Sequence, residues 1–118
     1  MAELKDIIYL TSNSDFIQSH IEELVINTDS ICITKLGNNI EKLTINAKSV
    51  SFYGSINANS LKSLTINATE LVSISHAYME QLTSVDITCQ YYKGVDFSDV
   101  ERYENIQNVS IKEITPQE

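Results

Sequence analysis

The chain has 118 residues, of which 42% are hydrophobic and 20% are charged, and its formal net charge is −8. This size predicts one domain with a single apolar core. The acidic balance disfavours binding to nucleic acid or anionic membranes, which need basic clusters, and is compatible with a basic protein partner. No apolar run approaches the roughly 20 residues of a spanning helix, and the first residues lack a secretory signal pattern, so we expect a cytoplasmic protein.

Six copies of a short apolar phrase follow one another along the chain. The phrases occupy residues 4–10, 21–27, 40–46, 61–67, 82–88 and 106–112, and the first is the weakest. Starting positions 4, 21, 40, 61, 82 and 106 are 17 to 24 residues apart, within the period range of stacked repeats. We therefore predict a single solenoid domain over residues 1–118, in which 114–118 form a frayed tail.

Apolar residues stand at the first, fourth and sixth positions of each phrase. In the second phrase Leu24 and Ile26 alternate with Val25, which is the period of a β-strand with one apolar face. A single strand of this kind cannot bury that face, whereas stacked copies bury it against one another. The phrases therefore predict parallel strands stacked in register, with the residue at the fifth position exposed.

A second alternating segment follows three of the phrases, at residues 31–33, 50–52 and 72–74, the third being shifted by one residue. It predicts another short extended segment in each coil.

Asn27, Asn46 and Asn67 end three successive phrases and predict corners, because asparagine tolerates left-handed backbone; an internal ladder of asparagines is the alternative. Residues 12–20 and 98–104 begin like capped helices, so we expect short helical turns near both ends.

The phrase Leu-x-x-Leu-x-Ile resembles the strand segment of leucine-rich repeats, and residues 50–66 and 72–87 are most similar to the BspA-like class. The resemblance implies a mainly-β solenoid of five to six coils of about 17–24 residues, and a binding scaffold without catalytic activity. A right-handed parallel β-helix is the alternative fold, since two extended segments per coil suit it well.

On this resemblance, the exposed positions of the strand face form the candidate binding face. They are Glu22, Glu23, Val25, Glu41, Lys42, Thr44, Lys62, Ser63, Thr65, Thr83, Ser84, Asp86, Gln107, Asn108 and Ser110. A solvated sheet face without a partner is the alternative interpretation. Tyr91, Tyr92 and Lys93 are a secondary candidate patch, because tyrosine is enriched in interfaces; packing in the core would also explain the tyrosines.

No residue pattern indicates catalysis, a metal site or a cofactor. The three glycines are isolated, which excludes a phosphate-binding loop. Cys32 and Cys89 lie three repeats apart, too far for a disulfide, and Cys89 falls at a small inward position that predicts a buried thiol. His20 and His76 are separated in the same way and have no ligands at metal-binding spacing.

The leading functional hypothesis is therefore a non-catalytic protein–protein interaction module. An acidic inhibitor that mimics nucleic acid and blocks a basic groove is the alternative, although the phrases from residue 21 onward carry four acidic and three basic residues where a mimic needs regular negative charge. Glycan or ice binding through Thr44 and Thr65 is a weaker alternative, and so is self-assembly through the terminal strands.

Overall fold

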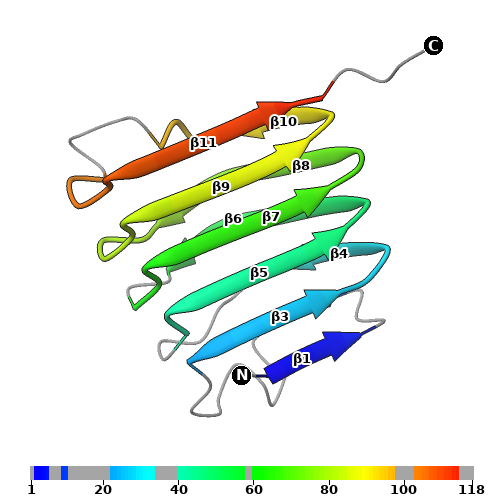
Figure 1. The fold of residues 1–118 in the computed structure, drawn as a ribbon, viewed down its shortest axis with the longest axis horizontal. Helices are drawn as coiled ribbons and strands as arrows, with labels where there is room; N and C mark the ends of the chain where they lie inside the picture. Colours follow the sequence, from blue (N-terminus) through cyan, green and yellow to red (C-terminus); the bar gives the residue numbers. More distant parts are fainter. Residues whose placement is uncertain are drawn as a thin grey trace.

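The computed structural model describes residues 2–5, 9–10, 22–33, 40–57, 60–97 and 103–114. It contains two parallel sheets, one behind the other, and the chain alternates between them along its length (Figure 1). In spatial order, sheet A comprises β1 (Ala2–Lys5), β3 (Glu23–Asn27), β5 (Lys42–Ala47), β7 (Ser63–Ala68), β9 (Ser84–Cys89) and β11 (Asn108–Glu113). Sheet B comprises β10 (Tyr91–Gly94), β8 (Leu71–Tyr78), β6 (Ser49–Asn57), β4 (Ser30–Ile33) and β2 (Tyr9–Leu10). The predicted mainly-β solenoid of stacked parallel strands is confirmed.

The apolar residues at the fourth and sixth positions of the phrases form two continuous rows on the side of sheet A that faces the core. Ile26, Ile45, Ile66 and Ile87 are direct partners in successive strands, and all four side chains are fully buried. The fourth-position residues from Leu24 to Val85 form the second row in the same way. From residue 21 onward, equal positions in the phrase therefore become equal positions in the register, because each strand must place the same alternate residues in the core. The predicted first phrase, residues 4–10, does not follow this rule: Leu4 pairs with Ile26 in sheet A, whereas Tyr9 and Leu10 pair with residues of β4 in sheet B.

Sheet B contributes the opposite wall of the core. The buried side chains that the structure describes in this sheet are Ile31, Ile33, Val50, Phe52, Val72 and Ile74. The one-residue shift of the third segment does not disturb the register, since Val50 pairs with Val72 and Phe52 with Ile74. The extra residue lies in the turn between β7 and β8, which spans residues 69–70, whereas residue 48 alone separates β5 from β6.

Backbone hydrogen bonds also stack the turns that lead into sheet A. The carbonyl oxygen of Glu22 accepts bonds from the N–H groups of Glu41 at 2.7 Å and Lys42 at 3.0 Å. The carbonyls of Glu41, Lys62 and Thr83 accept the same pair of bonds from the next coil. The coils are thus joined at their turns as well as along their strands, which fixes the height of each side chain relative to its neighbours.

Two features expected from the sequence are the asparagine corners and the helical turns near both ends. The first is wrong, and the second falls mainly on residues that the structure does not describe. The asparagines are not corners: they lie within or at the end of β3, β5 and β7, and the chain bends two to three residues later. The described residues contain no helix, and the expected helical turns fall mainly on residues 12–20 and 98–102, outside the description, while residues 104–105 form a turn. Within the described part, no helix has the length and apolar character needed to cross a membrane.

The last coil is less covered than the others. Val109 pairs with Val85, yet Val109 is 40% exposed and Val85 only 1%. Sheet B ends at β10, which follows β9, so no described strand of sheet B follows β11. Within the described ranges, Val109 and Ile111 therefore have no strand of sheet B opposite them, unlike the equivalent residues of the earlier coils.

Candidate functional site

The structure brings the predicted binding residues together on the outer face of sheet A, the side of β3, β5, β7, β9 and β11 that points away from the core. The residues form three rows that cross the strands in register. The border row is Glu22, Glu41, Lys62, Thr83 and Gln107; the second row is Glu23, Lys42, Ser63, Ser84 and Asn108; the middle row is Val25, Thr44, Thr65, Asp86 and Ser110.

Most side chains of the middle row are short, and all are half-buried or exposed. Thr44 and Thr65 are direct partners in adjacent strands, flanked by Val25 on one side and Asp86 on the other. Hydroxyl groups at the strand spacing of about 4.8 Å can donate and accept hydrogen bonds without the conformational freedom of long side chains. The centre of the face is thus a rigid polar surface.

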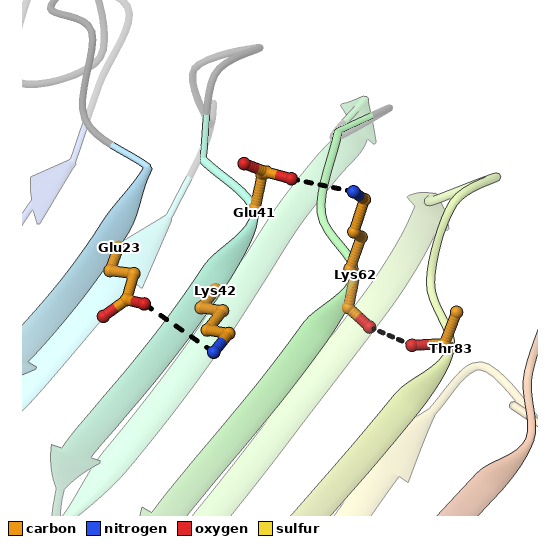
Figure 2. Close-up of polar contacts among 5 residues, drawn as sticks. All are labelled: Glu23, Glu41, Lys42, Lys62 and Thr83. Atoms are coloured by element: carbon orange, nitrogen blue, oxygen red, sulfur yellow. Dashed lines mark hydrogen bonds and ion pairs between the residues drawn. The ribbon is translucent and has the colours of Figure 1, made fainter.

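Opposite charges pair across neighbouring strands along the border of the face (Figure 2). Lys62 Nζ lies 2.9 Å from Glu41 Oε1, and Lys42 Nζ lies 3.7 Å from Glu23 Oε1. The hydrogen bond to Glu41, assisted by its charge, raises the pKa of the Lys62 ammonium above its ordinary value of 10.5. The Thr83 hydroxyl donates to the carbonyl oxygen of Lys62 at 3.0 Å and continues the chain of contacts.

These pairs line a shallow hollow of about 260 Å³ formed by Glu22, Glu23, Glu41, Lys42 and Lys62. Both ion pairs are solvent-exposed, with side-chain exposures between 38% and 65%, so each contributes little to the stability of the fold. The pairing could have been predicted from the sequence. In each pair, the acidic and the basic residue stand at the same position of two successive phrases.

A third ordered feature borders the face at the carboxyl ends of the strands and was not predicted as part of the site. Asn46 Nδ2 donates to Asn27 Oδ1 at 2.8 Å, and Asn67 Nδ2 donates to Asn46 Oδ1 at 2.9 Å. The three side chains belong to the outward-facing set of β3, β5 and β7, so this asparagine ladder lies outside the core. An amide can donate to one neighbour and accept from the other, which makes asparagine suited to a repeated position in stacked strands.

The secondary patch lies on the other sheet, in β10, away from the candidate face. Tyr91 is 61% exposed and its strand partner Leu71 is also exposed, as is Lys93. Tyr92 points inward, where its hydroxyl donates to the Val95 carbonyl oxygen at 2.5 Å, and burial raises the pKa of its phenol above the ordinary 10.0. Tyr91 and Lys93 therefore form the exposed part of the patch, and Tyr92 packs against the core.

The two cysteines lie apart from this face. Cys32 and Cys89 are both free thiols, as expected, and Cys89 is fully buried; burial raises the pKa of its thiol above 9.0. His20 and the side chain of His76 lie outside the described residues. Within the described ranges, no group of three histidine, cysteine or carboxylate side chains is arranged to hold a metal ion.

The outer face of sheet A therefore combines ordered ion pairs, a row of short polar side chains and an asparagine ladder on one surface, and these groups can recognise a ligand by shape, hydrogen bonding and charge. No protein-family model, curated protein or solved structure matches the chain.

Proposed function

We propose that the chain is a non-catalytic protein-interaction module that binds its partner through the outer face of sheet A. The observation that carries the proposal is the order of this face. Ion pairs fix its side chains at one border, amide hydrogen bonds fix them at the other, and the side chains between them are mostly short. Little side-chain entropy remains to be lost when a partner binds, which favours association.

The size of the face sets the expected strength of binding. Five strands about 4.8 Å apart, each about six residues long at about 3.3 Å per residue, cover roughly 400 Å². A stable interface buries about 800 Å² on each partner. One face of a single chain is therefore suited to a transient complex.

The charge of the face is mixed, which favours a protein partner over the role of a nucleic-acid mimic. Lys42 and Lys62 are each paired with a glutamate, so the border does not present the continuous negative charge of a nucleic-acid backbone. Glu22 and Asp86 are exposed acids of the same face and would contact basic groups of the partner. The resemblance of the phrases to leucine-rich repeats supports the same proposal, because proteins of that family are generally binding scaffolds.

The test is affinity capture with variants of the two sheets. Thr44→Arg combined with Thr65→Arg places two long cations at the centre of the face and should reduce recovery of a specific partner by about tenfold or more. The matched control is Ser51→Arg with Ser73→Arg, which changes two paired, half-buried residues of sheet B. Equal loss with both double variants, or no loss with either, would contradict the proposal.

A further inference from the structure

The last described strand, β11, exposes apolar side chains beside an edge that pairs with no other described strand. Val109 is 40% and Ile114 56% exposed, and Ile111 is half-buried against the core. Among the described residues, β11 pairs with β9 alone. Figure 1 shows β11 as the outermost strand of its sheet. An open edge next to exposed apolar residues is a surface on which another strand can add.

The hydrogen bonds between β11 and β9 show which backbone groups of β11 would be available to an added strand. Asn108 donates its N–H to the Thr83 carbonyl at 3.2 Å, and Ile114 donates to the Cys89 carbonyl at 2.6 Å. Because successive residues of a strand point their backbone groups to opposite sides, Val109, Ile111 and Glu113 present their N–H and C=O groups to the free edge. The exposed backbone donors and the exposed apolar side chains thus belong to the same stretch of chain.

A second copy could cover this edge in parallel, with its β1 continuing the solenoid, but the charges oppose this arrangement. Lys5 pairs with Asn27 in β1 and β3, and the same register position in β11 is Lys112. Continuing the stack would place Lys112 directly opposite Lys5 of the second copy. Like charges facing each other across strands are destabilising.

Antiparallel pairing of β11 with β11 of a second copy gives a complementary arrangement. With Ser110 of both copies at the centre, Val109 faces Ile111 of the second copy, and Ile111 faces its Val109. Both residues present backbone groups to the edge, so these are hydrogen-bonded pairs. Lys112 then faces Asn108, and Glu113 faces Gln107, so the register has no like charges directly opposite each other.

We propose that the free edge of β11 is a self-association site, at which two copies pair antiparallel around a two-fold axis at Ser110. The pairing is isologous and closed, so it produces a dimer and no fibre. It joins the two A sheets into one continuous sheet and brings the apolar residues of the two incomplete coils together.

The test is sedimentation analysis over a concentration series. The native chain should pass from monomer to dimer and no further. Ser110→Lys places two lysines opposite each other at the axis and should raise the dimer dissociation constant by about tenfold. Thr65→Lys is the matched control, because Thr65 lies in the same row two strands away, and it should leave dimerisation unchanged.

A charge-swap experiment identifies the axis. Ser110→Glu alone should also weaken the dimer, whereas an equimolar mixture of Ser110→Lys and Ser110→Glu should recover dimer, since the opposed charges then attract. Thermal melts of the variants verify that they remain folded. A monomer at every concentration, growth beyond a dimer, or a dimer insensitive to Ser110→Lys would each overturn the proposal.

Discussion

Ile45→Ala tests the stacked core directly, because Ile45 lies inside the buried row of isoleucines in sheet A. Its strand partners on the two sides are Ile26 and Ile66, and all three side chains are 0% exposed. The strand that carries Ile45 is hydrogen-bonded on both edges, so neighbouring strands cannot close on the space that the missing side chain leaves. The variant should therefore contain a cavity close to the full size of the removed atoms.

Truncation of an aliphatic residue to alanine in such a site costs about 2–5 kcal/mol, with the upper half expected where the cavity cannot collapse. We expect about 3–4 kcal/mol. An unfolding entropy of about 2.1 cal/mol/K per residue gives about 0.25 kcal/mol/K for a chain of 118 residues. The expected decrease in Tm is thus about 12–16 °C.

Calorimetric or circular-dichroism melting measures this decrease. Thr44→Ala is the matched control, because Thr44 is next to Ile45 on the opposite side of β5 and is half-buried. It should lower Tm by no more than about 4 °C, since a change on the solvent side costs at most about 1 kcal/mol. A Tm for Ile45→Ala within about 3 °C of the native value would refute the stacked core. Equal decreases for the two variants would refute the assignment of the buried side.

Three further predictions concern other parts of the fold. Asn46→Ala removes both side-chain bonds of the central ladder residue and should lower the free energy of unfolding by about 1–2 kcal/mol in denaturant titration, more than Thr44→Ala; an equal effect would contradict the role of the ladder. Gly94 has φ +140°, and an added Cβ would lie 2.0 Å from a backbone oxygen, so Gly94→Ala should destabilise the chain in thermal melts much more than Lys93→Ala does. Burial raises the pKa of the Tyr92 phenol in the folded state, so its contribution to stability is complete below its ordinary pKa of 10.0 and is lost as the pH rises above it; a melting series at alkaline pH should show a steeper decline for the native chain than for Tyr92→Phe.

The sequence predicted the inner architecture well because one periodicity determines it. The fourth and sixth residues of each phrase are apolar, and a strand has only two sides, so the choice of buried side and the register between copies follow from the same pattern. Val85 and Ile87 show the result, as do their counterparts in β3, β5 and β7, with exposures of 0–1%. The same argument places the second and middle rows of the candidate face on the outer side. The border row has the parity of the buried residues and lies in the turns that precede the strands, which a period of two alone does not predict.

The parts that the sequence did not predict depend on where a strand ends. The neighbours of Asn67 in the sequence are the same whether the residue forms a corner or belongs to a strand, and its side chain bonds to Asn46 because the two residues are paired in β7 and β5. Val109 is exposed although its phrase resembles the others. No described strand of sheet B follows β11, and the residues of the phrase itself do not indicate this. Gly94 is isolated in the sequence, and its need for glycine arises from the close approach of the Ile74 carbonyl.

The two proposals make a joint prediction, because the antiparallel dimer would keep both outer faces on the same side of the continuous sheet. Two adjacent faces of roughly 400 Å² each together reach the size of a standard interface on one partner. A partner that spans both faces should bind the dimer more tightly than the monomer. Ser110→Lys should then weaken partner capture as well as self-association, and the mixture with Ser110→Glu should restore both. Weakened dimerisation with unchanged capture would instead show that one face suffices for binding, and would leave the Thr44→Arg/Thr65→Arg test as the independent measure of the face itself.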